Sequence, residues 1–366
     1  MKWLERAWYA NAPWLIVLWP LHAVFVALAA WRRRRLTAVA EPYPVPVVIV
    51  GNISVGGTGK TPLLIALVKH LQAKGLRPGV VSRGYGSKAT SFPVSVTAST
   101  AVDESGDEAL IIARQCGCPV VVDPDRVRAV NRLLAMGDID VILSDDGLQH
   151  YAMSRDIEVV VVDGERRFGN GLCLPAGPLR EPAARLADAS LVVVNGGRTE
   201  SAKTREVLTA NGVHWASSEQ APATQSGVEP VEGFGIRVEP NCFVNVVSGE
   251  KRPYQGAPFK MGSHLHAVSG LGNPQRFYAL LEELGHKVTK HSFPDHHRFT
   301  QEDFSRLGLE ANQPIVMTEK DAVKVGDFAQ ENYWFLTIRM KLPTRFLAAF
   351  DKRLAAAQKA RACAAR

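Results

Sequence analysis

The stretch GNISVGGTGKT, residues 51–61, decides the fold of this chain. It follows an apolar, β-branched run at 45–50 and precedes PLLIALVKHLQAKG, which has helical spacing. A strand, a glycine-rich turn and a helix in this order are the context of a phosphate-binding P-loop. Gly56, Gly57 and Gly59 allow consecutive backbone N–H groups to point toward phosphate oxygens, and the helix N-terminus adds partial positive charge.

This loop predicts a site for a nucleoside triphosphate. Lys60 is expected to reach the β- and γ-phosphates, and the hydroxyl of Thr61 is expected to ligate Mg²⁺. Ser54 stands where the strict G-x-x-x-x-G-K-[ST] pattern has its first glycine, so a glycine turn with a chance Gly-Lys-Thr is the alternative. The expected nucleotide-binding residues are Ser54, Val55, Gly56, Gly57, Thr58, Gly59, Lys60 and Thr61.

Composition and charge indicate a folded protein with an unusual N-terminal segment. The chain has 366 residues, 46% of them hydrophobic, and a formal net charge of +7. Residues 1–35 contain six basic residues and one acidic residue, a net charge of +5, which leaves only +2 for the rest. This distribution argues against a nucleic-acid-binding body and for an N-terminal segment that meets an anionic surface. Five scattered cysteines without a C-x-x-C pair fit a reducing compartment.

An uncharged apolar run at 13–31 is followed at once by the basic cluster Arg32–Arg35. Nineteen residues at 1.5 Å each give about 28 Å, close to the thickness of the hydrocarbon core of a bilayer. Tryptophans in the run suit the membrane interface, and the arginines mark a cytoplasmic flank. The run is expected to contact a membrane, either spanning it or lying in its interface. A helix packed on the protein itself is the alternative.

Beyond residue 40, short β-branched runs alternate with helical patterns, which predicts an α/β fold with a doubly wound, mostly parallel sheet of the P-loop NTPase type. Ligands are then expected at the carboxyl ends of the strands. The predicted divisions are a membrane-associated helix with a basic flank at 1–40, a P-loop core at 41–218, a linker or exposed loop at 219–240, a smaller α/β lobe at 241–350 and a helical, partly disordered tail at 351–366.

The segment SDDGLQH, 144–150, follows an apolar strand and so occupies the position of a Walker-B element. Asp145 or Asp146 is expected to hold Mg²⁺ opposite Thr61. Adjacent side chains point in opposite directions along a strand, so one carboxylate is expected to serve the metal and the other to position a neighbour. Acids that only cap the end of a strand are the alternative.

Three further segments carry candidates whose roles the residues alone leave open. Asp107 in GDEA is either the N-cap of an apolar helical run or a catalytic carboxylate. Asp295 stands beside His296 and His297, which could be metal ligands, part of an acid–base dyad or solvent-facing loop histidines. The segment PAGPLRE, 175–181, is in isolation only a rigid loop.

Nine motifs occur in order along the chain: VGGTGKTP, SRGYG, GDE, PDR, SDDGLQH, GNG…LPAGPLRE, SGLGNP, FPDHHRF and TEKDAVK. Together they closely resemble the tetraacyldisaccharide 4′-kinase family, the lipid A 4′-kinases of Gram-negative bacteria. The resemblance covers nearly all the chain, and the family's loop has the form VGGTGKT, so Ser54 is no objection. It implies phosphorylation, dependent on ATP and Mg²⁺, of the 4′-hydroxyl of a tetraacylated glucosamine disaccharide 1-phosphate. It also implies a place on the cytoplasmic face of the bacterial inner membrane.

The resemblance implies roles for individual residues as well. Asp107 becomes the general base, oriented and tuned by His296, while Lys60 neutralises the triphosphate. Asp145 and Asp146 become the Walker-B acids. The remaining candidates are Glu181 as a second magnesium or active-site carboxylate, Arg126 as a substrate or phosphate contact, and Gln149 and His150 nearby in the site.

Two competing classes remain open on the sequence. A membrane-tethered GTPase switch would use the same loop and acids, and TEKD, 318–321, faintly resembles a guanine-reading element. A soluble ATPase with a buried N-terminal helix is the third class. The partners expected for the kinase are the lipid substrate and a membrane surface, with no nucleic acid and no obligate protein partner.

Overall fold

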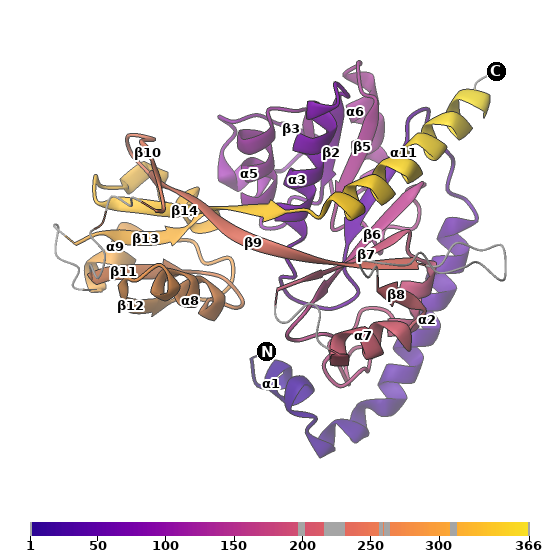
Figure 1. Ribbon diagram of the computed structural model, residues 1–366, viewed down its shortest axis with the longest axis horizontal. Coiled ribbons are helices and arrows are strands. Elements are labelled where there is room, and N and C mark those ends of the chain that lie inside the picture. The colour runs from indigo at the N-terminus through magenta and orange to yellow at the C-terminus, as the bar shows by residue number, and fades with distance from the viewer. Residues whose placement is uncertain are drawn as a thin grey trace. The chain divides into compact units, whose positions relative to one another are not determined.

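The computed structural model describes residues 2–196, 202–215, 231–255, 259, 264–307 and 313–364. The chain forms two compact units, each built from separate stretches of sequence (Figure 1). Unit 1 comprises Met1–Arg83, Asp123–Arg237 and Lys341–Arg366. Unit 2 comprises Gly84–Val122 and Val238–Met340.

Unit 1 is built on a parallel sheet whose central strands are buried along their whole length. Burial on both faces explains why these strands are continuous β-branched runs without polar alternation. The predicted mostly parallel α/β sheet is confirmed. In spatial order the strands are β2 (Pro78–Ser82), β5 (Val141–Asp145), β1 (Val47–Gly51), β6 (Ile157–Asp163), β7 (Leu191–Asn195) and the first part of β9 (Val231–Asn245), with β8 (Val213–Trp215) also paired to β9.

Strand β1 lies between β5 and β6, and all three strands run parallel. The chain therefore leaves β1 toward one side of the sheet, through α3 (Lys60–Ala73) to β2, and later fills the other side. A reversal of strand order of this kind is the switch point at which open α/β sheets bind ligands, outside the carboxyl ends of the strands. The loop after β1 and the end of β5 both lie there.

The helices of unit 1 owe their positions to apolar residues at helical spacing. In α3, Leu63, Leu64, Leu67 and Leu71 are fully buried and form one face. The remaining helical elements are α1 (Lys2–Ala10), a 3₁₀ turn (Pro13–Leu18), α2 (Trp19–Thr37), α6 (Arg126–Ala135), a 3₁₀ turn (Ala183–Asp188), α7 (Ala202–Thr209) and α11 (Thr344–Ala364).

The predicted N-terminal helix starts later and ends later than the apolar run at 13–31. Residues Pro13–Leu18 form a 3₁₀ turn, and α2 begins at Trp19 and continues through the arginine cluster to Thr37. Pro20 stands in the first turn of α2, where a missing backbone N–H breaks no helical hydrogen bond.

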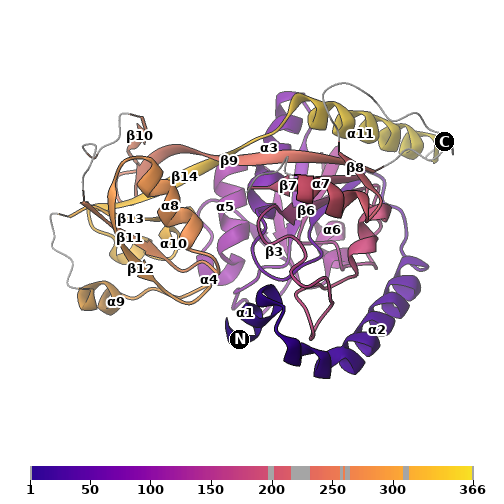
Figure 2. The ribbon, with the colours of Figure 1, turned by 60° about the horizontal axis from the view of Figure 1, so that its bottom comes forward.

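Helix α2 buries none of its residues and runs along the outside of unit 1 (Figure 2). The described residues contain one helical stretch, Pro13–Thr37, that is long and apolar enough to cross a membrane. Length and composition alone do not distinguish a membrane helix from a signal sequence. The exposure of α2 does argue against the alternative in which this helix is buried in the protein.

Unit 2 has a second sheet with its own core. Its strands, in spatial order, are β12 (Lys287–Ser292), β11 (His264–Ser269), β13 (Ile315–Thr318), β14 (Tyr333–Lys341) and the second part of β9, to which the short β10 (Lys251–Pro253) pairs antiparallel. The pairs between β12, β11, β13 and β14 are parallel. Strands β3 (Val94–Val96) and β4 (Val120–Val122) form an antiparallel pair.

Aromatic residues dominate the core of unit 2. One cluster forms around Phe243, Tyr278 and Trp334, and another around Phe299 and Phe304. The helical elements that pack on the strands are α4 (Val102–Ser105), α5 (Asp107–Cys116), α8 (Gln275–Glu283), α9 (Gln301–Arg306), α10 (Glu319–Ala322) and a 3₁₀ turn (Gly326–Phe328).

Three predicted boundaries differ from the structure. Residues 231–240, expected to end the linker 219–240, form the first part of β9, whereas 219–230 lie outside the described residues. The stretch Gly84–Val122, expected in the core 41–218, groups with unit 2. The glycines and prolines in EPVEGFGIRVEP gave this segment the composition of a loop, although it contains the start of a strand. The grouping of Gly84–Val122 with a distant part of the chain depends on tertiary contacts, which no local sequence pattern predicts.

The third difference concerns the C-terminal tail, expected at 351–366. Helix α11 already begins at Thr344 and continues to Ala364, and the last two residues lie outside the described part of the chain. Phe346, Phe350 and Leu354 are buried at helical spacing, so this helix is an integral part of unit 1.

Candidate active site

A glycine loop, residues 54–59, joins β1 to α3 and opens at the helix N-terminus. Gly56 and Gly59 have φ values of 98° and 89°, in the left-handed region that L side chains rarely adopt. A Cβ added to Gly57 would meet nothing within 4 Å, so the loop borders open space there. Backbone N–H groups at the start of α3 add their partial positive charge, which suits this loop to an anion.

Hydrogen bonds from neighbouring segments hold the glycine loop in place. The N–H of Val55 donates to the carbonyl oxygen of Pro178 at 2.8 Å. The side-chain amide of Asn195, at the end of β7, donates to the carbonyl oxygen of Thr58 at 2.9 Å. The amide of Asn52 donates to the carbonyl oxygen of Ser54 at 2.8 Å. Neighbouring segments therefore fix the path of the loop, which lowers the entropy cost of binding.

Lys60, the first residue of α3, extends toward polar groups at the carboxyl edge of the sheet. Its Nζ donates to Asn52 Oδ1 at 3.1 Å and lies 3.5 Å from Asp146 Oδ1. Arg180 lies 3.3 Å from the other carboxylate oxygen of Asp146. Burial alone would raise the pKa of Asp146, but the charges of Lys60 and Arg180 outweigh it and lower this pKa. Asp146 is thus an ionised group held between two cations.

Asp145, the last residue of β5, faces a different neighbour. The hydroxyl of Thr61 donates to Asp145 Oδ2 at 3.2 Å. A threonine hydroxyl and a carboxylate are hard oxygen donors of the kind that Mg²⁺ prefers, so this pair fits that ion. The described residues contain no group of three or more His, Cys, Asp or Glu arranged for a metal. Mg²⁺ usually needs only one or two carboxylates, because phosphate oxygens and water complete its shell.

Arg126 lies almost completely buried beside the end of β5. Its Nη1 donates to the carbonyl oxygen of Asp123 at 2.6 Å and its Nη2 to that of Asp145 at 3.4 Å. Burial lowers the pKa of Arg126 to about 10, against the opposing charges of Asp145 and Asp146. Arg126 thus supports the turn that carries both acids, and the substrate or phosphate contact that the resemblance implies for it stays a prediction.

Glu181 takes part in a separate buried network. Its carboxylate accepts hydrogen bonds from the hydroxyl of Tyr151 and from Gln149 Nε2, the latter at 2.7 Å. Arg185 Nε lies 3.4 Å from it. Gln149 Nε2 also donates to the carbonyl oxygen of Asn52 at 3.2 Å, so Glu181 is linked through Gln149 to the start of the glycine loop. The structure thus gives Glu181 three protein partners.

His150 lies next to this network and is held in its neutral form. Burial, together with the positive charges of Arg126, Arg83 and Arg32, lowers its pKa to about 4. Helix α2 also reaches this region, since Arg32 donates to the carbonyl oxygen of Gln149 at 3.0 Å.

The candidates of unit 2 gather around Asp107, which is 4% exposed. Asp107 is the first residue of α5, and the N-cap position belongs to Gly106, so the N-cap alternative for Asp107 is wrong. Its Oδ1 accepts from the N–H of Glu108 at 2.9 Å, and its Oδ2 lies 3.1 Å from His296 Nδ1 and 3.2 Å from Lys324 Nζ.

His296 completes this pair from the loop after β12. Lys320 Nζ lies 3.3 Å from His296 Nε2. An ammonium can only donate and a carboxylate can only accept, so these two contacts select the neutral tautomer with its proton on Nδ1, facing Asp107. Tyr85 packs against the imidazole with a centroid distance of 4.5 Å. A solvent-facing histidine is therefore the wrong reading of His296.

The other residues of PDHHRF have separate partners. Asp295 Oδ1 lies 4.0 Å from His296 Nε2, at the limit of an ion pair. His297 Nε2 lies 3.0 Å from Asp303, a residue of α9. The two adjacent histidines thus serve different neighbours, and only His296 contacts Asp107.

The charges around Asp107 keep its carboxylate ionised. Burial would raise the pKa of Asp107, but the hydrogen bond from His296 and the charges of Lys320 and Lys324 lower it to about 2. Lys320 donates to Glu108 Oε1 at 2.9 Å. The charges of Glu108 and Asp107 overcome the burial of Lys320 and raise its pKa, so it stays protonated.

Sequence reasoning assigned no role to Asn52, Asn195, Lys320 or Lys324. Asn52 lies two residues before the glycine loop, and both lysines belong to the motif TEKDAVK. The sequence therefore marks these segments but does not show which side chains they contact. Asn195 is 137 residues from its partner Thr58, and only the pairing of strands reveals that contact.

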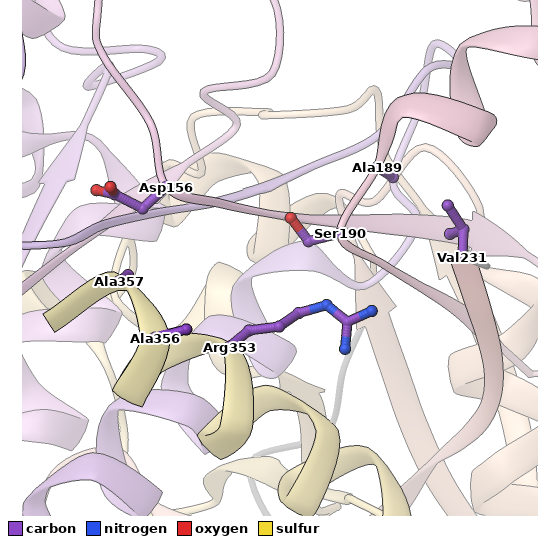
Figure 3. A pocket seen from close by; sticks show the side chains of 7 residues that line it. All are labelled: Asp156, Ala189, Ser190, Val231, Arg353, Ala356 and Ala357. Atoms are coloured by element: carbon purple, nitrogen blue, oxygen red, sulfur yellow. The ribbon is translucent and has the colours of Figure 1, made fainter. Parts of the chain in front are cut away.

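A cavity of about 400 Å³ lies elsewhere in unit 1, against α11 (Figure 3). It occurs at the amino ends of β6, β7 and β9, whereas ligands of parallel sheets bind at the carboxyl ends. None of the predicted site residues lines it. Its lining residues are Asp156, Ala189, Ser190, Val231, Arg353, Ala356 and Ala357.

Comparison with known proteins gives consistent matches over almost the whole chain. The model of the family described as tetraacyldisaccharide-1-P 4′-kinase, LpxK, matches residues 14–355. A tetraacyldisaccharide 4′-kinase of Pseudomonas putida (strain GB-1) is 43% identical over 354 residues, which cover 96% of each chain. The protein of the same name from Pseudomonas aeruginosa (strain LESB58) is 41% identical over the same length and coverage.

A solved structure is similar as well. The crystal structure of LpxK from Aquifex aeolicus in complex with ATP is 26% identical to this chain, with a TM-score of 0.68. The match covers 94% of this chain and 99% of that one.

Proposed function

Because this chain belongs to the tetraacyldisaccharide 4′-kinase family, we propose roles in phosphoryl transfer for its site residues. The chain is an ATP-dependent kinase that phosphorylates the 4′-position of a lipid A precursor. The pairing of Thr61 with Asp145 beside an open glycine loop is the observation in this chain that best supports the proposed chemistry.

The glycine loop is proposed to act as a P-loop for the triphosphate of ATP. Backbone N–H groups of residues 54–61 bind the phosphate oxygens, and Lys60 moves from Asn52 and Asp146 toward the β- and γ-phosphates. Asn52 and Asp146 hold the lysine near the loop. The preset geometry directs positive charge to the position where negative charge develops, which is usually the largest contribution to catalysis.

Thr61 and Asp145 are proposed to hold Mg²⁺. Bound there, this ion neutralises part of the phosphate charge and orients the transferred group. The contacts of Asp146 with two cations and of Glu181 with Tyr151, Gln149 and Arg185 favour positioning roles for both acids. Of the two adjacent carboxylates, Asp145 is thus the proposed metal ligand.

Asp107 is proposed to accept the proton of the attacking 4′-hydroxyl. The hydroxyl oxygen forms a bond to the γ-phosphorus while the bond from that phosphorus to the β–γ bridging oxygen breaks, and ADP leaves. The proton passes to the carboxylate of Asp107, which His296 orients through its Nδ1–H. A pKa of about 2 makes Asp107 a weak base. A weak base is adequate because the transition state of phosphoryl transfer is loose and needs little prior removal of the proton.

Helix α2 is proposed to bring the enzyme to its substrate in the bacterial inner membrane, with units 1 and 2 on the cytoplasmic side. A lipid with four acyl chains stays in the bilayer, so its phosphorylation must occur at the membrane surface. Arg32 and Arg33 contact Gln149 and Asp188 of unit 1. Arg34 and Arg35 are the arginines proposed to meet anionic headgroups.

The GTPase alternative loses its main support. In TEKD, Thr318 Oγ1 donates to Asp321 Oδ2 at 2.7 Å, and Asp321 is fully buried. An aspartate that reads a guanine base must present its carboxylate to the nucleotide, and Asp321 uses this oxygen within its own unit.

The test of the proposal is transfer of labelled phosphate from ATP to a tetraacyl disaccharide 1-phosphate in detergent. The wild type is expected to form the bisphosphate, Asp107→Ala to lose turnover while still binding ATP, and Lys60→Ala to lose both. Absence of transfer by the wild type, together with hydrolysis of GTP, would reject the kinase in favour of the switch.

A further inference from the structure

Lys324 is a buried cation with an unusual set of contacts. Its side chain is 8% exposed, and its Nζ lies 3.2 Å from Asp107 Oδ2 and 3.7 Å from Asp321 Oδ1. Among the residues that the structure describes, none forms a hydrogen bond of good geometry with this ammonium group. A buried ammonium is costly unless nearby carboxylates compensate its charge. The position of Lys324 is therefore defined by two carboxylates rather than by ordinary hydrogen bonds.

One of these carboxylates, that of Asp321, is rigidly held. Asp321 is fully buried, and its Oδ2 accepts from the N–H of Gly270 at 3.0 Å and from Thr318 Oγ1 at 2.7 Å. The N–H of Asp321 in turn donates to Thr318 Oγ1 at 3.2 Å. These bonds tie α10 to the end of β11 and to the end of β13. The side chain of Lys324 leaves the chain two residues beyond α10 and passes between Asp321 and Asp107.

We propose that Lys324 is a positioning residue for Asp107, and that Asp321 is the anchor that places Lys324. In this arrangement the ammonium group keeps the Asp107 carboxylate ionised and, together with His296 Nδ1, fixes its Oδ2. The inference rests on the proposed role of Asp107 as the proton acceptor.

Lys320, the other cation near Asp107, also lowers the pKa of Asp107, and does so more strongly than Lys324. Lys320 donates to Glu108 at 2.9 Å and lies 3.3 Å from His296, so its charge is shared with a second carboxylate and with the imidazole. Lys324 is the lysine whose ammonium contacts Asp107 directly. The titratable and charged groups around Asp107 are Tyr85, Glu108, Asp295, His296, Lys320, Asp321 and Lys324.

The sign of the expected effect follows from the charge. An opposite charge within about 4–6 Å lowers the pKa of a carboxylic acid by about 1–3 units. Replacement of Lys324 by a neutral side chain removes that charge, so the pKa of Asp107 rises above its value of about 2. Below this pKa the base is protonated and transfer fails.

The experiment measures kcat/KM for phosphate transfer by full-length protein between pH 4 and 8. Lys324→Met removes the charge and keeps the length of the side chain, Lys324→Gln removes the charge and keeps a donor, and Lys324→Arg keeps the charge. Lys290→Met is the matched control, because Lys290 pairs with Glu282 at 2.7 Å on the surface of the same unit.

In both neutral variants the ratio of variant to wild-type kcat/KM is expected to decrease at the acid end, by about tenfold for each pH unit below the raised pKa. The ratio is expected to stay constant across the pH range for Lys324→Arg and Lys290→Met. Thermal unfolding and ATP binding are measured for both neutral variants to show whether each one folds. If one of them does not fold, the pH dependence of the other tests the proposal.

Different results would overturn the role of Lys324 and the role of Asp107 as the base. A constant ratio in the neutral variants, with Asp107→Asn inactive, overturns the role of Lys324 and leaves the base in place. Full turnover by Asp107→Asn overturns the base itself. A loss of kcat/KM that is equal at every pH would show a merely structural role for Lys324, and would also overturn the inference.

Discussion

The side-chain oxygen of Asn52 accepts a hydrogen bond from Lys60 Nζ at 3.1 Å. The amide nitrogen of the same fully buried side chain donates to the carbonyl oxygen of Ser54 at 2.8 Å. One side chain therefore sets both the position of the lysine and the path of the glycine loop at the residue that departs from the usual glycine.

Replacement of Asn52 by alanine is expected to weaken ATP binding about tenfold. The change removes the hydrogen bond that fixes the loop at the Ser54 carbonyl and leaves this carbonyl without its donor, at a cost of about 1–2 kcal/mol. The KM for ATP, measured by phosphate transfer, should rise more than kcat decreases. Asn211→Ala is the control, because Asn211 makes the same kind of bond to the Val207 carbonyl on α7. An unchanged KM in Asn52→Ala would contradict a role for Asn52 in the loop.

Replacement of Lys60 by methionine is expected to lower kcat by about 10²–10³-fold. Methionine preserves much of the side-chain volume but removes the charge that stabilises the transferred phosphate. Single-turnover transfer measured at saturating ATP separates this loss from weaker binding. If transfer persists at the wild-type rate, Lys60 is not the phosphate-binding lysine.

Thr61 allows a direct test of the magnesium site. Thr61→Val is isosteric but lacks the hydroxyl that donates to Asp145, so it should require a higher Mg²⁺ concentration for half-maximal turnover. Thr61→Ser retains the hydroxyl and should behave like the wild type. A Mg²⁺ titration of turnover compares the three proteins. Identical titrations would place the ion elsewhere.

The buried His150 predicts a pH dependence of stability. Its folded-state pKa of about 4 lies below the ordinary value of 6.5, so the unfolded state binds the extra proton first as the pH falls. The free energy of unfolding should therefore decrease between pH 6.5 and pH 4, by about 3 kcal/mol from this residue.

His150→Gln cannot take up that proton and is the variant that tests this effect. Chemical denaturation at several pH values should show that the stability of His150→Gln relative to wild type increases as the pH falls from 6.5 to 4. A difference that does not change with pH would show that His150 keeps its ordinary pKa in the folded state.

The exposed apolar face of α2 predicts a requirement for a membrane. Leu21, Val24 and Leu28 are each more than half exposed. Their joint replacement by glutamine should reduce turnover of the lipid in vesicles, while ATP binding stays unchanged. These substitutions test the helix more specifically than removal of residues 1–35 does. Trp8 of α1 donates a hydrogen bond to the carbonyl oxygen of Pro175, so the deletion would also disturb the loop that contains Pro175. Unchanged turnover in vesicles would contradict the role of α2.

Most of the candidate residues could be predicted, but their partnerships could not. The glycine loop, the acids after β5 and the DHH segment are recognisable because each is a local pattern of residue types at short spacing. The division of labour between Asp145 and Asp146 was open on the sequence. In the structure Thr61 contacts one acid and Lys60 the other, because Asp145 ends the strand whereas Asp146 adopts a positive φ of 49° in the turn beyond it.

The sequence by itself determined the alternation of buried strands and helices, the phosphate-binding loop and the apolar N-terminal helix. Each of these features is encoded by the spacing of hydrophobic residues or by turn-forming residues within a stretch of about twenty residues. Only the tertiary structure decided that Gly84–Val122 joins unit 2 and that Asp107 meets His296, 189 residues away, and Lys324. Such contacts arise from strand order and helix packing, which bring together side chains whose separation in sequence carries no periodic signal.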